Sequence, residues 1–131
     1  MKKLNISYIT REDATDKTKW SGLSYNIYNC LLKTGNKIEL ISPITSIFEK
    51  FLKIIELLYS LIGIKFDPER SIYLSKILAK KIETKIKGKK IDLIFVHDCP
   101  LISFLNTKIP IIIWTDLTFD LYQKSYFKNY K

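Results

Sequence analysis

Two apolar runs, Ile91–Val96 and Ile109–Trp114, each end abruptly in polar residues. Four side chains follow these runs directly, namely His97, Asp98, Thr115 and Asp116. Imidazole and carboxylate groups act as general acids and bases, and the pKa of a carboxylate at the rim of an apolar core is readily shifted. We therefore take these four residues as the first candidates for a functional site.

His97 and Asp116 are the candidates for catalysis. His97, the only histidine, is either a general base or hydrogen-bond donor to substrate, or a solvent-facing loop residue. Asp116 is either an acid–base group or the cap of a following helix. No metal is expected, because His97, Asp98 and Cys99 are consecutive and cannot all point the same way, and HxxxH and CxxC spacings do not occur.

Trp20, Ser21 and Gly22 form a third group of candidates, where a polar loop leads into a helix. A glycine at a helix start lets a phosphate approach backbone N–H groups. The sequence has no GxGxxG pattern, no Walker A loop and no GxSxG elbow. The loop therefore predicts a phosphate contact without indicating which nucleotide.

These candidates need a fold that brings them together. Short Ile-rich runs that are apolar on both faces are typical of central strands in a parallel sheet. We expect one α/β domain over residues 1–131, with a Rossmann-like parallel sheet and helices on both faces. The expected strands lie near residues 4–10, 37–42, 91–96 and 110–114. Ligands bind outside the carboxyl ends of such strands, where the candidates would lie.

Helical spacing of apolar residues marks the connections between the strands. The first helix would be capped by Ser21 or Ser24 and end at Gly35. Its apolar positions are Leu23, Ile27, Cys30 and Leu31. A later helix would span residues 67–88 and a short one residues 100–105.

Residues 46–62 are the most apolar segment and predict a helix that begins with the capping box Ser46-x-x-Glu49. The segment is interrupted by charges and is shorter than the roughly 20 residues that a membrane-spanning helix needs. Two interpretations stay open: a helix packed on the sheet, or a helix at an anionic membrane surface with three lysines at the headgroups. Those lysines are Lys50, Lys53 and Lys65.

The formal net charge of +9 favours anionic partners. Of the 22 basic residues only Arg11 and Arg70 are arginines, and proteins that read nucleic acid rely on arginine for bidentate contacts. Nucleic acid is therefore not an expected partner. Because no signal peptide precedes the first strand, we expect a cytoplasmic protein. Peripheral contact with the inner face of the membrane stays open. Cys30 and Cys99 would then be reduced thiols.

Three stretches carry a resemblance to a known family. They are Trp20-Ser21-Gly22, Gly35-Asn36-Lys37-Ile38-Glu39 and, most specifically, Ile112-Ile113-Trp114-Thr115-Asp116-Leu117-Thr118-Phe119. Together they resemble the N-terminal half of glycosyltransferase family 4, whose members have the GT-B fold of two Rossmann-like domains facing each other across a cleft. The resemblance implies one half of a GT-B fold, and no stretch of this sequence matches the Glu-x7-Glu motif of the family's C-terminal donor-binding domain.

The resemblance also implies roles for individual residues. Ser21 and Gly22 would lie near the donor phosphates, Asp116 beside the donor sugar and the acceptor hydroxyl, and His97 on the acceptor side. Substrate contacts would fall to the neighbours Trp20, Asp98 and Thr115. The donor substrate is a nucleotide sugar, and neither a metal nor a separate cofactor is implied.

The expected function is therefore that of the acceptor-side domain of a retaining glycosyltransferase. Such an enzyme transfers a sugar from a nucleotide sugar to a hydroxyl of a saccharide or lipid-linked acceptor, and this chain alone would be inactive. Two alternatives remain: a non-catalytic Rossmann-like module that binds a nucleotide or a partner, and a peripheral membrane-binding domain.

Overall fold

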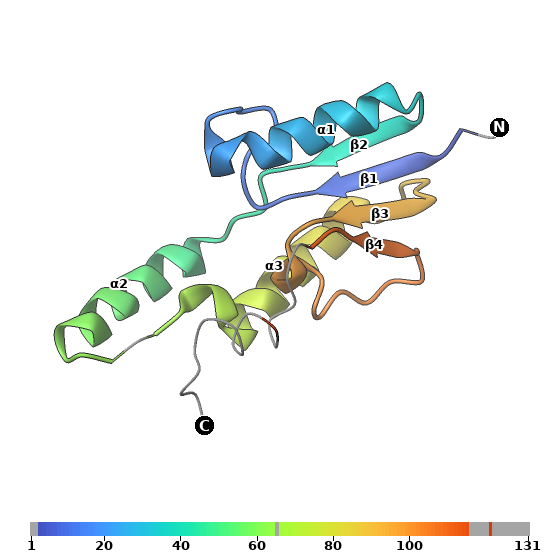
Figure 1. The fold of residues 1–131 in the computed structure, drawn as a ribbon. Coiled ribbons are helices and arrows are strands. Elements are labelled where there is room, and N and C mark those ends of the chain that lie inside the picture. Colours follow the sequence, from blue (N-terminus) through green and yellow to red (C-terminus); the bar gives the residue numbers. More distant parts are fainter. Residues whose placement is uncertain (1–2, 65, 116–120, 122–131) are drawn as a thin grey trace.

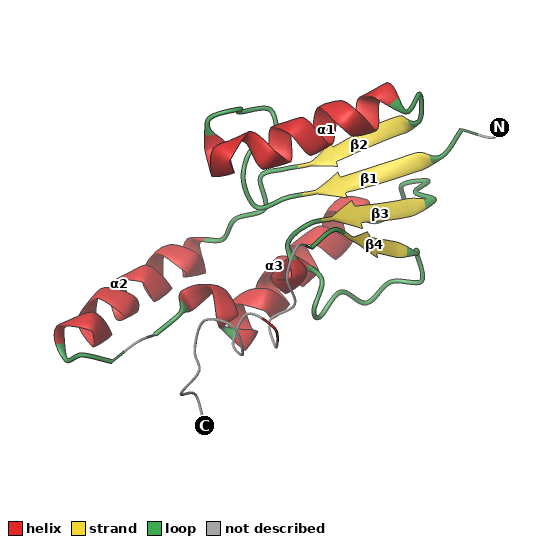
Figure 2. Cartoon of the chain, in the orientation of Figure 1, coloured by secondary structure: helices red, strands yellow, loops and turns green. Residues whose placement is uncertain are grey.

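A computed structural model describes residues 3–64, 66–115 and 121. Its centre is a sheet of four parallel strands in the order β2-β1-β3-β4 (Figures 1 and 2). The strands are β1 (Asn5–Ile9), β2 (Lys37–Ile41), β3 (Leu93–Val96) and β4 (Ile111–Ile113). All four lie where the sequence places them, and the expected α/β fold with a parallel sheet is confirmed.

Three α-helices and three short 3₁₀ turns connect the strands. They are η1 (Lys19–Gly22), α1 (Leu23–Lys33), α2 (Ile47–Leu61), η2 (Pro68–Arg70), α3 (Ile72–Ile86) and η3 (Cys99–Leu101). The segment expected as one helix over residues 67–88 is divided, because Asp67 caps η2 and Ser71 separately caps α3. The expected helix at residues 100–105 is only the turn η3.

Helices α1 and α3 cover opposite faces of the sheet. Tyr8 of β1 stacks on Tyr28 of α1, whereas the next residue, Ile9, lies in the core with Leu78 and Ile82 of α3. Consecutive residues of a strand point to opposite faces, so the two helices lie on opposite sides. The expected helices on both faces are therefore confirmed (Figure 1).

The main core lies between the sheet and α3. Each fully buried aliphatic side chain there contributes about 1.5–3 kcal/mol relative to an exposed one. Its central members are Ile9, Ile41, Leu74, Leu78, Ile82, Ile94, Val96 and Leu101. This layer holds the ends of β1 and β3 in register, and these are the strand ends that carry the candidate site.

The expectation of a central strand at Ile109–Trp114 is wrong. Strand β4 pairs only with β3 within the described residues and is the edge of the sheet there. Ile112 and Ile113 are 47% and 45% exposed, and Trp114 is exposed as well. Strand order is a tertiary property, so an Ile-rich run has the same pattern at an edge as in the middle of a sheet. The expectation is correct for β3, where Ile94 and Val96 are fully buried.

The buried face of α1 also differs from the expected one. Leu23 and Cys30 are exposed, and Ser24 is fully buried. Neither serine caps the helix, because Gly22 is the N-cap residue and no side chain accepts a hydrogen bond there. Gly35 does follow the helix end with a positive φ of 73°, as a glycine after a helix commonly does.

Helix α2 begins as expected at Ser46, whose hydroxyl accepts from the N–H of Phe48. The second half of the expected capping box is absent, because the Glu49 carboxylate instead binds Arg11. Only Leu52 of α2 is buried, so the helix is not packed on the sheet along its length. Within the described residues, every helix is too short or too polar to cross a membrane.

Candidate functional site

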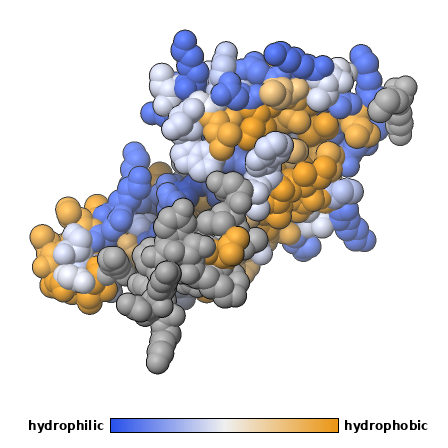
Figure 3. Space-filling view, in the orientation of Figure 1, coloured by the Kyte–Doolittle hydropathy of each residue, from blue (hydrophilic) through white to orange (hydrophobic). Residues whose placement is uncertain are grey.

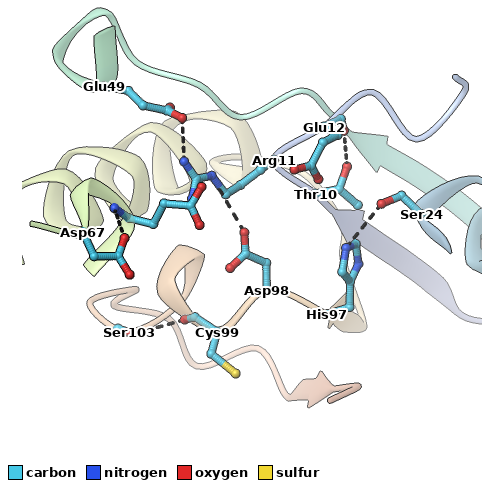
Figure 4. Close-up of polar contacts among 11 residues, drawn as sticks. Thr10, Arg11, Glu12, Ser24, Glu49, Asp67, His97, Asp98, Cys99 and Ser103 are labelled. Atoms are coloured by element: carbon cyan, nitrogen blue, oxygen red, sulfur yellow. Dashed lines mark hydrogen bonds and ion pairs between the residues drawn. The ribbon is translucent and has the colours of Figure 1, made fainter. Parts of the chain in front are cut away.

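The strand order places a switch point between β1 and β3. Strand β2 lies on one side of β1, and β3 and β4 lie on the other. In parallel α/β sheets, ligands bind outside the carboxyl ends of the strands at such a point. We call the residues that follow these two strands the switch-point residues; they are Thr10, Arg11, Glu12, His97 and Asp98 (Figure 4).

His97 lies on the α1 face and closes a ring of hydrogen bonds. Its Nδ1 lies 3.1 Å from the hydroxyl of Tyr8, and its Nε2 lies 3.3 Å from Oγ of Ser24. The Tyr8 hydroxyl also donates to the Ser24 carbonyl at 3.3 Å. Tyr8 and Ser24 are fully buried and His97 nearly so. Three elements, β1, α1 and β3, are therefore joined at this ring.

One tautomer of His97 satisfies every group of the ring. The Tyr8 proton goes to the Ser24 carbonyl, so Nδ1–H of His97 donates to the Tyr8 oxygen and Nε2 accepts from the Ser24 hydroxyl. Burial lowers the pKa of His97, although the charge of Glu12 opposes this. The imidazole is therefore neutral at pH 7. Since both ring nitrogens are engaged, the arrangement favours a positioning role for His97 over that of a general base.

Trp20 covers His97 from the solvent side. The two rings stack with centroids 4.8 Å apart and an angle of 28°, and Trp20 is more than half exposed. Trp20 has φ 45° and Ser21 has φ 54°, a left-handed conformation that costs a non-glycine residue about 1–2 kcal/mol. The packing of the indole on His97 holds this strained turn, and it presents one aromatic face outward.

Gly22 is needed for a different reason from the expected phosphate approach. Its φ is 74°, and a Cβ at this position would lie 3.1 Å from the carbonyl oxygen of Lys17. The glycine therefore allows the loop to pack against its own backbone. The predicted phosphate contact at Ser21 and Gly22 stays a prediction.

Arg11 and Asp98 lie on the opposite side of the switch point, toward α2 and η2 (Figure 4). Nη2 of Arg11 donates to Oε1 of Glu49 at 2.6 Å. Nη1 lies 3.5 Å from Oε1 of Glu69, and Nε lies 3.9 Å from Oδ2 of Asp98. We call these four residues, Arg11, Glu49, Glu69 and Asp98, the arginine cluster.

The arginine cluster has one cation and three carboxylates. Burial would lower the pKa of Arg11, but the charges of Glu69, Glu49 and Asp98 outweigh burial and raise it. The guanidinium therefore stays charged. Within the described residues, the second carboxylate oxygen of Glu49 is buried and accepts no hydrogen bond.

Asp98 is a switch-point group whose pKa is raised toward neutral pH. Burial raises its pKa from 3.8 to about 6; Arg11 opposes the rise, and the charges of Glu12, Glu69 and Glu49 add to it. Its side chain is 21% exposed, so solvent or a ligand can reach it. A carboxyl with a pKa near the working pH can both release and accept a proton. Asp98 can therefore act as a base toward a bound hydroxyl.

Replacing Asp98 with asparagine is expected to raise the free energy of unfolding at pH 7.5 by about 1–3 kcal/mol. A carboxyl with a raised pKa in the folded state stabilises the fold below its ordinary pKa of 3.8, and this contribution is lost as the pH rises through about 6. Asparagine keeps the shape without the cost of a buried charge. Urea unfolding at several pH values should show the gain above pH 6 and no gain near pH 4.

The matched control for this prediction is Asp13→Asn, which changes an exposed carboxylate in the loop after β1. It should show no gain that grows with pH between 4 and 7. If Asp98→Asn behaves like this control, Asp98 does not carry a buried charge.

The structure brings some of the predicted site residues together and separates others. Trp20 stacks on His97 on the α1 face, and Ser21 and Gly22 follow Trp20 in the same 3₁₀ turn. Asp98 lies on the other side of the switch point, because consecutive residues after β3 diverge. Thr115 is exposed after β4. Asp116 lies outside the described residues, so its expected place beside His97 stays a prediction.

The sequence interpretation missed several residues of the site, among them Tyr8, Arg11, Ser24 and Glu49. For Arg11 a signal was present, because it is one of two arginines among 22 basic residues. Arginine forms multidentate contacts with carboxylates that lysine cannot make. An isolated arginine directly after a strand in a lysine-rich chain thus indicates a specific structural use. The other three have no comparable local signal.

The candidate site stands without support from known proteins. Comparisons with protein-family models, with curated proteins and with solved structures find no match to this chain. In the described part of the chain, no group of three or more histidine, cysteine or acidic side chains is placed to hold a metal ion.

Proposed function

We propose that this chain is the acceptor-side half of a retaining glycosyltransferase, with Asp98 as the residue that binds the acceptor hydroxyl. The observation that carries the proposal is the partly exposed Asp98, with a pKa of about 6, at the switch point of a parallel sheet. The resemblance of Trp20-Ser21-Gly22 and of the stretch at 112–119 to glycosyltransferase family 4 supports the reaction class.

In this proposal the residues of the switch point have separate tasks. Asp98 accepts the hydrogen bond of the acceptor hydroxyl and takes up its proton as the hydroxyl becomes a nucleophile. Arg11 stabilises the carboxylate form of Asp98. The exposed face of Trp20 packs on the apolar face of a sugar ring, and His97 holds Trp20 in place. Asp116 keeps its expected role beside the donor sugar.

The donor is expected to bind this chain poorly. The family's donor site lies in the second domain, so calorimetric titration with UDP- and GDP-sugars should give at most millimolar affinity, about −4 kcal/mol. Turnover of these compounds by the chain alone should be undetectable. Micromolar binding would contradict the half-enzyme proposal and favour the alternative, a self-sufficient nucleotide-binding module.

Acceptor binding can be followed through Trp20. The chain has two tryptophans, so Trp114→Phe leaves Trp20 as the single fluorescent indole. A panel of oligosaccharides should contain members that quench this fluorescence saturably, and Asp98→Ala should weaken the effective ones about tenfold or more, as loss of a charged hydrogen bond predicts. Asp13→Ala is the matched control and should leave the titration unchanged. Equal affinity in both variants would remove Asp98 from the proposed site.

A further inference from the structure

Helix α2 carries an exposed apolar stripe. Figure 1 shows α2 running outward from the sheet, and in Figure 3 hydrophobic side chains gather over its projecting end. Seven apolar side chains, each between 55% and 86% exposed, form the stripe: Ile47, Phe51, Ile54, Leu57, Leu58, Leu61 and Ile62. Such a contiguous apolar surface is typical of an interaction site.

The charges around the stripe are positive. Lys50 lies one turn before Ile54 and Lys53 lies one turn before Leu57; both lysines are exposed and form no ion pair with any described residue. Neither of the two acidic side chains of α2 lies beside the stripe. Glu49 turns inward to Arg11, and Glu56 lies about 160° around the helix from Leu58. An apolar surface bordered by unpaired cations complements a partner that is apolar and anionic.

A fluid bilayer fits this surface better than a second copy of the chain. The stripe lies on the outward side of a projecting helix, and α2 is too short to cross a membrane. An amphipathic helix of this kind lies in the interface, with its apolar side chains among the acyl chains and its lysines at anionic headgroups. A second copy of the chain would present the same positive border and no carboxylate, because Glu49 is paired with Arg11 and Glu56 lies far around the helix.

We infer that the stripe of α2 docks on the surface of an anionic phospholipid bilayer, with Lys50 and Lys53 at the headgroups. This interaction is independent of the proposed sugar transfer, because it uses no switch-point residue. Lys65, the third lysine expected at the headgroups, lies outside the described residues. A docked α2 would hold the carboxyl edge of the sheet near the bilayer, where lipid-linked molecules are found.

Vesicle co-sedimentation tests the inference with the full chain. Vesicles of phosphatidylcholine alone are compared with vesicles of equal parts phosphatidylcholine and phosphatidylglycerol. We expect clear binding to the anionic vesicles, weaker binding to the neutral ones, and a decrease on addition of salt. Equal, negligible binding to both kinds of vesicle would overturn the inference.

Two pairs of substitutions locate the contact. Ile54→Ser with Leu58→Ser should weaken binding to anionic vesicles about tenfold or more, since each buried side chain contributes at least that much. Ile72→Ser with Tyr73→Ser is the matched control, because these side chains of α3 are at least as exposed, and it should bind like the parent. Equal loss in both pairs would overturn the inference.

Two further experiments test the role of the lysines and the possibility of self-association. Lys50→Gln with Lys53→Gln should weaken binding to anionic vesicles about tenfold and leave neutral vesicles unaffected. Sedimentation velocity should show a monomer in the absence of lipid. A dimer that the Ile54 and Leu58 substitutions dissociate, in a chain that does not bind vesicles, would assign the stripe to a second copy instead. Far-ultraviolet circular dichroism confirms that each variant is folded.

Discussion

Replacing Arg11 with methionine is expected to lower the free energy of unfolding by about 3–5 kcal/mol at neutral pH. Arg11 is only 7% exposed and is the cation of a cluster that contains Glu49, Glu69 and Asp98. Methionine keeps most of the length of the side chain. It leaves Glu49 and Asp98 as neighbouring, largely buried carboxylates without a cation. Urea unfolding of the parent and the variant measures the loss.

The loss should become smaller in acid. Beside Arg11 the pKa of Asp98 is about 6, because burial raises it and Arg11 opposes the rise. Without Arg11 the pKa of Asp98 should rise further, so Asp98 takes up a proton more readily. Protonation removes the uncompensated charge, and the stabilities of parent and variant should approach each other as the pH falls below about 6.

Glu69→Gln is the control for Arg11→Met. The Glu69 side chain is 65% exposed and its oxygen lies 3.5 Å from the guanidinium. An exposed ion pair of this kind contributes about 1 kcal/mol or less. If Arg11→Met lowers the free energy of unfolding no more than Glu69→Gln does, the arginine cluster is not a buried network and its contact with α2 does not stabilise the fold.

Replacing His97 with leucine is expected to lower the free energy of unfolding by about 2–5 kcal/mol. The substitution removes the hydrogen-bond acceptor of the buried Ser24 hydroxyl and one of the two partners of the buried Tyr8 hydroxyl. A buried polar group without its partner costs about 1–3 kcal/mol. Urea unfolding at pH 8, where His97 is neutral in both the folded and the unfolded chain, measures this cost without a contribution from its titration.

The pH dependence of the free energy of unfolding gives a second measure of the contribution of His97 to stability. Burial lowers its pKa in the folded protein below 6.5. The neutral imidazole of His97 therefore stabilises the fold above pH 6.5. This contribution is lost as the pH falls through the pKa that His97 has in the folded protein. His97→Leu should remove this loss, and the rise in stability that Asp98 contributes in acid should then be easier to detect.

A double-mutant cycle with Tyr8→Phe tests whether His97 acts through the ring of hydrogen bonds. Tyr8→Phe should cost less in the His97→Leu background than in the parent, with a coupling of about 0.5–3 kcal/mol. Ser7→Ala is the control, because Ser7 is a buried neighbour in β1 whose side chain points to the other face of the sheet. Independent effects of Tyr8→Phe and His97→Leu would contradict the ring.

The carboxyl ends of β1 and β3 hold two groups of residues that come from distant parts of the chain. Arg11 meets Glu49 across 38 positions, and His97 meets Tyr8 across 89. The two contacts use opposite sides of the same switch point. They explain why the stability of this region should depend on pH in opposite directions through His97 and Asp98, because burial disfavours the charged form of each group.

The sequence by itself determined the features that depend on local chemistry. The Ile-rich run before His97 identified a buried strand, Gly35 a helix end, and Ser46 the start of α2. Backbone conformation and hydrogen bonding within a few residues decide these features. Together with the spacing of apolar residues, they were enough to predict the parallel sheet and the edge at which His97 and Asp98 lie.

Only the tertiary structure decided which residues meet and which are exposed. Strand order places the run at Ile111–Ile113 at an edge of the described sheet, and the direction of α2 leaves its apolar residues outside the core. The pairing of Arg11 with Glu49 and of His97 with Ser24 likewise depends on the packing of helices on the two faces. Packing acts between segments far apart in the chain, and no local pattern of residue types encodes those distances.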